Sequence, residues 1–448
     1  MRSGAARSSP FRRPASLPAR PDRDPRAASV RPEPGPPVRG PLGALLAAAL
    51  LAGLPALTAC GREGGPRPVP CPADSAGVPV VSSGKQGEWA RHGLTPRLEE
   101  VWQAGGLREG EELAAPLPPA AGLQGRLAIP DFRLGKVFVL GADGAWSGAW
   151  GGRGEGPGEY LRPIAAAWSR EGRLAVLDVA AGRVVFLRDG RAARDPVRVA
   201  PDLLGRLVAG GELRWQAIGP DGTLFLLPPV RADTGAGGAP SARSFLLRAV
   251  PGGAGADTLL SARERTLGGD FPGWHAPGWP RLVAAAGPHG EVVAAGWEPG
   301  YRLAEFGPDG SLVRFVCRGV PAIPFRDAER GTAASDSAPA RVRALRRALE
   351  SAPAPSRPAA VGRIFIGAEG RIWAQRDRPR ALAPGDATFG PPGGTFDVFG
   401  PEGRWLGEVR AAEGARLVAA SGRRVWAFVR GDLDQTTVVA YRLVLERG

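Results

Sequence analysis

The charged side chains best placed to contact a ligand lie in a glycine-rich peptide at residues 151–163. Its glycines stand at near-alternate sites, which allows the chain a tight and unusual path. The peptide looks superficially like a phosphate-binding loop. It lacks the Gly-Lys-Ser/Thr sequence, however, and no helical pattern follows it, so we exclude that function. Two interpretations remain, a structural connection between sheets and a ligand-binding loop. The candidate ligand-binding residues are Arg153, Glu155, Glu159, Tyr160 and Arg162.

A second irregular segment, at 270–280, places two tryptophans and a histidine close together in sequence. Aromatic rings on a loop can stack on a sugar or a peptide, so Trp274, His275 and Trp279 are further candidate ligand-binding residues. The alternative is that these aromatic side chains plug the edge of the propeller or fill the insertion. His275 alone is more typical of a surface or hydrogen-bonding residue than of a catalyst.

The sequence shows no pattern typical of a catalytic centre. Its three histidines are too far apart along the chain to suggest a metal-binding motif, and no Gly-x-Ser-x-Gly nucleophile elbow occurs. The three cysteines, Cys60, Cys71 and Cys317, have no metal-ligand spacing and are too few for a disulfide framework. We therefore predict no catalytic residue, no metal ligand and no cofactor.

A repeated pattern predicts the elements that position these loops. Six times, a glycine is followed by a short aliphatic or β-branched run, and several copies lead through an Asp-Gly-type turn into a second strand. Such a unit cannot bury its apolar face alone, so the copies must stack on one another. The pattern predicts an all-β fold, a six-bladed β-propeller of four-stranded antiparallel blades. The repeat glycines are Gly125, Gly172, Gly222, Gly290, Gly370 and Gly422.

Two further segments complete the expected ring. Residues 97–103 are typical of a lone N-terminal strand, which we expect to pair with the last strand, at 437–445, and so to remove an open sheet edge. Near 338–350, Val342, Leu345 and Leu349 share one helical face, which predicts a short helical insertion packed on the ring. A helix on a membrane surface or one that docks a partner would show the same arginine pattern.

The N-terminal part of the chain has the pattern of an export signal. An apolar run of about fifteen residues is too short to span a bilayer comfortably, follows Arg31 and Arg39, and ends in small residues. Its last four residues, 57–60, resemble a bacterial lipobox, which implies acylation of the Cys60 thiol. A plain cleaved signal peptide and an uncleaved anchor are the alternatives. Gly61, where an Asp is absent, resembles lipoproteins sorted onward to an outer membrane.

These patterns divide the chain into four expected regions. Residues 1–40 are a disordered Arg/Pro-rich extension, whose length favours a translation start downstream, at Val30. Residues 41–59 are a lipoprotein signal peptide, 60–80 a lipidated tether, and 81–448 the propeller. The expected location is the cell envelope, with a lipid anchor in the outer membrane and the propeller facing the periplasm or the cell surface.

The charge of the chain excludes one class of partner. The formal net charge is +14, but the arginines are dispersed among Asp and Glu, and no recognition motif accompanies them. We therefore expect no nucleic-acid binding. The expected partners are the membrane, through the lipid anchor, and an unknown protein, glycan or small-molecule ligand.

The peptide at 151–163 resembles the loop signature of a bacterial six-bladed β-propeller family related to NHL-repeat proteins. The resemblance covers about residues 80–446 and departs from the family in the long Ala/Pro/Arg-rich insertion. Many members are predicted lipoproteins of unknown function. The resemblance therefore implies an envelope-anchored lipoprotein with a binding or scaffolding propeller, whose loop residues would line one mouth of the central channel.

A second resemblance keeps an enzymatic alternative open. Calcium-dependent lactonases are similar in fold, and their central sites combine Asn with Glu and Asp. This chain has no Asn, so a divalent-cation-dependent hydrolase or lactonase, or a lyase, would need a site made of carboxylates alone. The residues available for such a Ca²⁺ site are Asp131, Asp178, Glu298 and Asp377.

Overall fold

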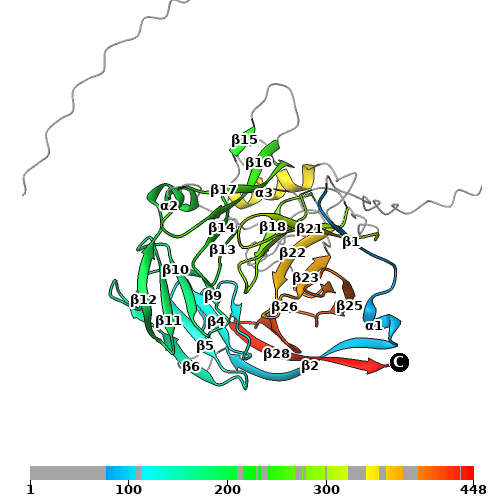
Figure 1. Cartoon of the computed structure of the whole chain (residues 1–448), viewed down its shortest axis with the longest axis horizontal. Coiled ribbons are helices and arrows are strands. Elements are labelled where there is room, and N and C mark those ends of the chain that lie inside the picture. The colour runs from blue at the N-terminus through cyan, green and yellow to red at the C-terminus, as the bar shows by residue number, and fades with distance from the viewer. Residues whose placement is uncertain are drawn as a thin grey trace, which may run out of the picture. The chain divides into compact units, whose positions relative to one another are not determined.

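The run that follows each repeat glycine forms the second strand of one of six antiparallel sheets, which are arranged as the blades of a propeller (Figure 1). This arrangement is seen in a computed structural model. The described residues belong to one compact unit, Glu63–Gly448. They are 77–106, 112–208, 215–228, 231–233, 241–253, 255–267, 275, 279–297, 300–320, 340–352, 360–376, 392–433 and 435–448.

Blades 1 to 3 follow one another along the chain, and each begins with its innermost strand. Blade 1 contains β3 (Ala120–Ala121), β4 (Leu127–Asp131), β5 (Lys136–Leu140) and β6 (Trp146–Trp150). Blade 2 contains β9 (Pro163–Trp168), β10 (Leu174–Asp178), β11 (Arg183–Arg188) and β12 (Arg191–Arg198). Blade 3 contains β13 (Trp215–Ile218), β14 (Leu224–Leu227), β16 (Ser241–Ala249) and β17 (Asp257–Arg265), with the short β15 (Arg231–Asp233) paired to β16.

Blades 4 to 6 include the strands that lie before blade 1 in the chain. Blade 4 contains β18 (Val283–Ala286), β19 (Val292–Ala295), β20 (Arg302–Phe306) and β21 (Leu312–Arg318), with β1 (Val80–Ser83) added in parallel. Blade 5 contains β22 (Val361–Ile366), β23 (Ile372–Arg376), β24 (Thr395–Phe399) and β25 (Trp405–Arg410). Blade 6 contains β26 (Ala415–Ser421), β27 (Arg424–Arg430), β28 (Thr436–Arg447) and β2 (Leu94–Gly105).

The repeat glycines lie in the turn between the innermost and second strands of each blade. Their φ angles are all positive, from 59° at Gly422 to 95° at Gly222, a region that side-chain-bearing residues rarely adopt. In five blades the glycine amide donates to the carbonyl three residues earlier, whereas Gly422 lies in a two-residue turn between the paired residues Ser421 and Arg424. In blade 3, the Gly222 amide donates to the Gly219 carbonyl at 3.0 Å, and the Gly219 amide donates to the Thr223 carbonyl at 2.7 Å. The prediction that glycine marks each repeat is therefore confirmed and has a backbone reason.

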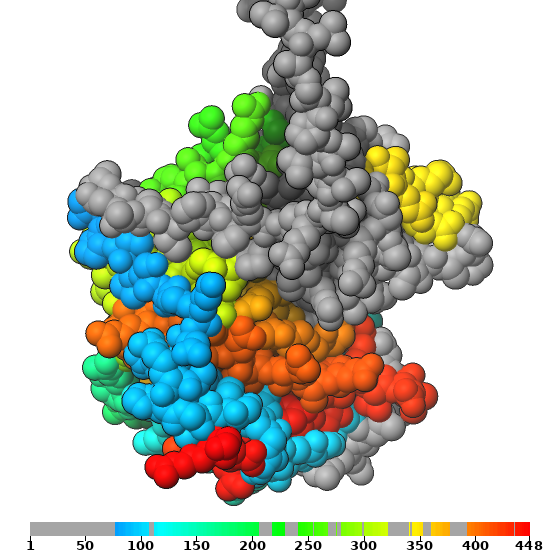
Figure 2. Space-filling view, turned by 90° about the vertical axis from the view of Figure 1, so that its right-hand side faces the viewer, coloured from blue at the N-terminus to red at the C-terminus, as the bar shows by residue number. Residues whose placement is uncertain are grey.

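The ring closes as the sequence predicts. β2 pairs antiparallel with β28 over the length of both strands, with Leu98 opposite Leu443. The two strands lie side by side along the lower edge of the molecule in Figure 1. Figure 2 shows the N-terminal segment, in blue, against the orange and red segments of the last blades. The outermost strand of blade 6 thus comes from the opposite end of the chain to its other three strands.

The apolar core lies in layers between neighbouring blades. Val139 of blade 1 packs in one layer with Val176 of blade 2, and Ile129 of blade 1 packs in another with Trp426 of blade 6. Each of the six junctions has such a layer, so every blade is covered on both faces. This mutual coverage is the physical reason that the units close into a circle.

The structure describes three helices, and one of them is the predicted insertion. That helix, α3, spans Ala340–Ser351, and its Leu349 is buried against Leu267 and Trp279. The sequence analysis did not predict α1 (Glu88–Arg91), whose Trp89 packs on blades 5 and 6, or α2 (Pro201–Val208), whose Leu203 packs between blades 2 and 3. No helix in the described part of the chain has the length and hydropathy needed to cross a membrane.

Candidate functional site: the axial channel

The innermost strands of all six blades enclose a cavity of about 230 Å³ on the axis of the ring. These strands are β3, β9, β13, β18, β22 and β26, and each lies against the innermost strand of the next blade. Because every blade begins with its innermost strand, all six run in the same direction along the channel. The face of the ring at which they begin is called the mouth face below. The connections between blades lie there.

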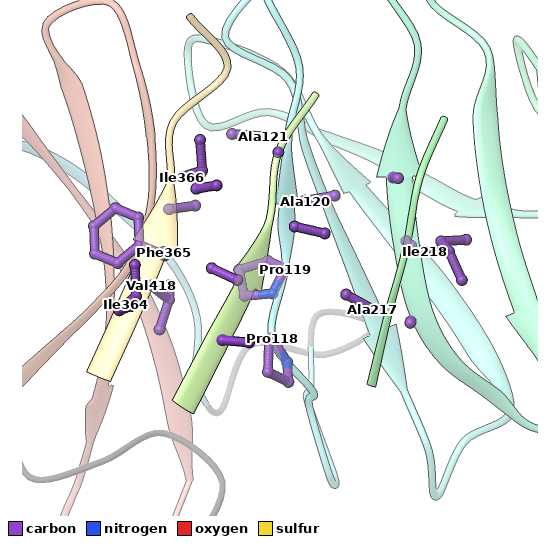
Figure 3. Close-up of a pocket in the computed structure, with 18 of the residues that line it drawn as sticks. Pro118, Pro119, Ala120, Ala121, Ala217, Ile218, Ile364, Phe365, Ile366 and Val418 are labelled. Atoms are coloured by element: carbon purple, nitrogen blue, oxygen red, sulfur yellow. The ribbon is translucent and has the colours of Figure 1, made fainter. Parts of the chain in front are cut away.

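The wall of the channel is mostly small and apolar. Ala166, Ala217 and Ala286 are half-buried residues of the wall, and Ile364 and Ile366 line the side formed by blade 5. Figure 3 shows these strands around the cavity, with Pro118 and Pro119 at the start of β3. Such a wall favours the apolar part of a small molecule, because its contact with water costs free energy.

Two arginines are the only charged residues among the described residues that line this cavity. Arg281 immediately precedes the buried Leu282 at the start of β18, and Arg363 is the third residue of β22. Arg416 is the second residue of β26 in the next blade, and it is 9% exposed. All three stand near the beginning of an innermost strand. They therefore place positive charge at the mouth face.

Arg363 has an unusual environment for a charged side chain. Its Nη1 atom is buried and has no hydrogen-bond partner. Burial, and secondarily the positive charge of Arg416, lower the pKa of the Arg363 guanidinium to about 10. The group is still charged at neutral pH, because that pKa lies above 7. The channel therefore contains a half-buried cation beside a second cation.

The glycine-rich loop at 151–163 lies between blades 1 and 2 and does not line the channel. It folds back on itself, so that β7 (Gly152–Arg153) pairs in parallel with β8 (Glu159–Tyr160). Arg153, Glu155 and Arg162 are exposed, and Glu159 is half-buried with its carboxylate accepting the Gly156 amide at 2.8 Å. The Arg162 guanidinium lies over the Phe132 ring at 4.9 Å. The structure therefore brings these side chains together on the loop but not at the axis.

Arg183 of β11 holds this loop in place. Its Nη1 donates to the Glu155 carbonyl at 2.6 Å, and its Nη2 donates to the Glu159 carbonyl at 3.0 Å. Gly151 explains the need for glycine, because its φ is +75° and a Cβ there would meet the Gly158 carbonyl oxygen at 2.5 Å. The sequence analysis did not identify Arg183. Its partners are backbone carbonyls, which leave no sequence signal.

The Tyr160 side chain packs between blades 1 and 2. Its side chain is fully buried, and its hydroxyl accepts a hydrogen bond from the Val137 amide at 3.1 Å. Burial raises the pKa of the Tyr160 hydroxyl, so that it stays neutral and keeps both of its hydrogen-bonding roles. The Tyr160 side chain therefore fixes the loop to β5 of blade 1.

The aromatic segment at 270–280 is placed only in part. Trp274 lies outside the described residues. The His275 side chain is 9% exposed, and its Nε2 lies 2.6 Å from Glu264 Oε2 on β17. Trp279 is 4% exposed, packs against α3, and lies under the Arg265 guanidinium at 4.8 Å. The described rings of this segment thus lie against β17 and α3.

The carboxylates considered for a calcium site either accept backbone hydrogen bonds away from the channel or lie outside the described residues. Asp131 is fully buried, with Oδ2 accepting the amides of Ala114 and Ala115 and Oδ1 accepting two more from the turn after β4. Asp178 accepts the Leu161 and Arg162 amides in the same way. Neither residue lines the channel, and Glu298 and Asp377 lie outside the described residues. Within the described residues, no group of three or more His, Cys, Asp or Glu side chains is arranged to hold a metal ion.

Sequence reasoning missed the channel arginines, although a signal for Arg363 exists. The innermost strands that precede Gly172 and Gly290 are apolar, Pro163–Trp168 and Val283–Ala286, whereas the strand that precedes Gly370 carries an arginine. A charged residue in an innermost strand must lie at an inter-blade junction or at the axis. Comparing the aligned repeats would have identified it.

The chain matches no protein-family model and no curated protein sequence. Solved structures of similar fold include a member of the DUF4221 family from Bacteroides vulgatus, with 10% identity, a TM-score of 0.43 and coverage of 79% of this chain and 99% of that one. A protein described as exported from Bacteroides fragilis has 10% identity, a TM-score of 0.39 and coverage of 82% and 99%. A gluconolactonase from Xanthomonas campestris has 13% identity, a TM-score of 0.35 and coverage of 78% and 98%. These values bear on the fold alone. The six-bladed arrangement expected from the sequence resemblance is present in this chain itself.

Proposed function

We propose that this protein is a lipid-anchored propeller of the cell envelope that binds a small ligand in its axial channel. Recognition would use groups already held in place by the rigid ring, without a covalent step. The observation that carries the proposal is the preformed cavity of about 230 Å³, to which every blade contributes its innermost strand. Other ring-shaped scaffolds bind proteins at their rims, and that alternative would leave the cavity without a role.

The cavity proposal predicts that filling the channel abolishes binding. Ala166 of β9 is half-buried and lines the channel, so Ala166→Phe would place a ring inside it. Full-length protein solubilised in detergent is incubated with a cell extract, washed, and analysed by mass spectrometry for retained small molecules. We expect the unmodified protein to retain at least one compound and the variant to lose it by a factor of about ten or more, because the ring occupies the ligand's volume.

The matched control is Ala193→Phe, on the exposed outermost strand β12 of the same blade. It adds the same ring without touching the channel, and it should retain the compound. Equal retention by both variants, or no retention by the unmodified protein, would count against a ligand site on the axis.

The anchor is proposed from the lipobox-like residues 57–60. Cys60→Ser removes the thiol that would be acylated, so we expect the protein to move from the membrane fraction to the soluble fraction. Fractionation followed by immunoblotting measures this change. Cys71→Ser is the control, because Cys71 is the next cysteine along the chain and should leave membrane association unchanged. Membrane retention of Cys60→Ser would contradict the anchor.

A further inference from the structure

We propose that the ligand of the axial channel is a small anion with an apolar body, a carboxylate or a phosphate ester, whose charged group is bound by Arg363. This inference rests on the proposed function, since it names the class of ligand that the channel binds. It is carried by the position of Arg363 in the channel wall with an unbonded Nη1, in contrast to the paired arginines Arg318 and Arg183.

Two enclosed arginines, Arg318 and Arg183, have their charge paired or most of their donors bonded, although each keeps an unbonded Nε. Arg318 is 3% exposed and forms ion pairs with the carboxylate of Asp397, in the next blade, and with Glu408 Oε1 at 2.9 Å. Arg183 donates to several carbonyls of the glycine-rich loop and lies near Asp178. These two residues show the usual rule that enclosed cations are paired.

Arg363 departs from that rule. Among the described residues, no carboxylate pairs with it, and its Nη1 has no hydrogen-bond partner. The charge that acts on its pKa is that of Arg416, which is also positive. An enclosed cation of this kind costs free energy unless an anion joins it, and a planar guanidinium matches carboxylate and phosphate oxygens with two parallel hydrogen bonds. The missing partner is therefore expected to be an anion.

The rest of the channel wall determines the chemistry of the uncharged part of the ligand. No Asp or Glu occurs among the described residues that line it, so nothing there repels an anion or replaces it. Arg281 adds a second positive charge near the mouth face. Beyond the arginines, the wall consists of residues such as Ala217, Ala286 and Ile366, which suit an apolar body. The arrangement places the charge of the ligand near the mouth face and its apolar part along the axis.

The test compares probes that differ only in charge. Benzoate and phenyl phosphate carry an anionic group on a ring, whereas benzamide is uncharged and close to benzoate in shape. Isothermal titration of the solubilised full-length protein should show benzoate or phenyl phosphate binding about tenfold or more tightly than benzamide. Arg363→Met should remove this preference. It should also raise the melting temperature of the ligand-free protein, because it removes an unpaired enclosed charge.

Two controls separate the possible failures. Arg410→Met changes an exposed arginine on the outermost strand of the same blade and should keep the preference for the anions. Ala166→Phe should abolish binding of all three probes. Equal affinity for benzoate and benzamide, with binding still blocked by Ala166→Phe, would overturn the anion inference and leave the channel proposal standing. Binding that Ala166→Phe does not affect, or no binding of any probe, would overturn both.

Discussion

A chain that begins at residue 107, and so lacks β1, α1 and β2, is expected to lose the cooperative fold entirely. β2 supplies the outermost strand of blade 6, and its removal leaves the edge of β28 unpaired over its length. It also exposes the core layer in which Trp89 packs against blades 5 and 6. Losses of this size exceed the total stability of a typical domain, about 5–15 kcal/mol. Circular dichroism on heating should show no unfolding transition. Size-exclusion chromatography should show large aggregates.

The matched chain begins at residue 77 and keeps all three elements. It should unfold in one transition and elute as a discrete species, because the closing strand is still present. If the chain beginning at 107 unfolded as cooperatively as the chain beginning at 77, the ring would not depend on closure by β2.

Replacing Asp131 with Ala is expected to destabilise the protein by about 3–5 kcal/mol. The carboxylate is fully buried and accepts four backbone amides, two from the connection before β3 and two from the turn after β4. Alanine leaves those buried donors without an acceptor. Chemical denaturation, with the free energy of unfolding extrapolated to water, measures the change. Asp131→Asn should be intermediate, because it keeps one acceptor oxygen and turns an N–H group toward the amides.

The control for this prediction is Asp143→Ala in the exposed turn of the same blade. Asp143 makes one hydrogen bond there, from the Ala145 amide at 3.1 Å, so the loss should be below about 1 kcal/mol. Both effects should be the same in calcium and in a chelator, since the partners of Asp131 are amides. Stabilisation by calcium that disappears in Asp131→Ala would instead favour the cation-dependent hydrolase.

The fold followed from local signals because the repeat is local. Gly125, Gly172 and their equivalents must adopt positive φ, and the apolar runs beside them must be covered by a neighbouring copy. The pairing of residues 97–103 with 437–445 could also be predicted, because a closed ring of such units needs one blade that is completed by strands from both ends of the chain. What failed was local detail without a repeat, such as α1 and α2, which are held by tertiary packing of Trp89 and Leu203 against the blades.

The candidate site was harder to predict because proximity to the axis is a property of the closed ring. The glycine-rich loop is dense in Arg and Glu, yet its side chains serve the junction between blades 1 and 2 or point to solvent. Arg363 stands alone in an apolar strand, and nothing adjacent in sequence indicates that Arg416, more than fifty residues away, lies near it. The clustered charges of the glycine-rich loop therefore have structural roles, whereas the isolated Arg363 lies at the proposed site.

This division has a physical basis. Side chains at the ends of strands, such as Asp131, Asp178 and Arg183, satisfy backbone groups that the inter-blade connections would otherwise leave unpaired. A residue that binds a ligand instead has a hydrogen-bonding group without a partner in the ligand-free protein. Arg363 has this property among the residues of the channel wall, at a cost in stability that ligand binding would recover.

The most direct test of the account is a crystal structure of the protein grown with benzoate. The account predicts electron density for the ring on the propeller axis, with the carboxylate within hydrogen-bond distance of the Arg363 guanidinium. Benzoate bound only on the rim or the outer strands, with an Arg363 side chain turned away from the axis, would contradict it.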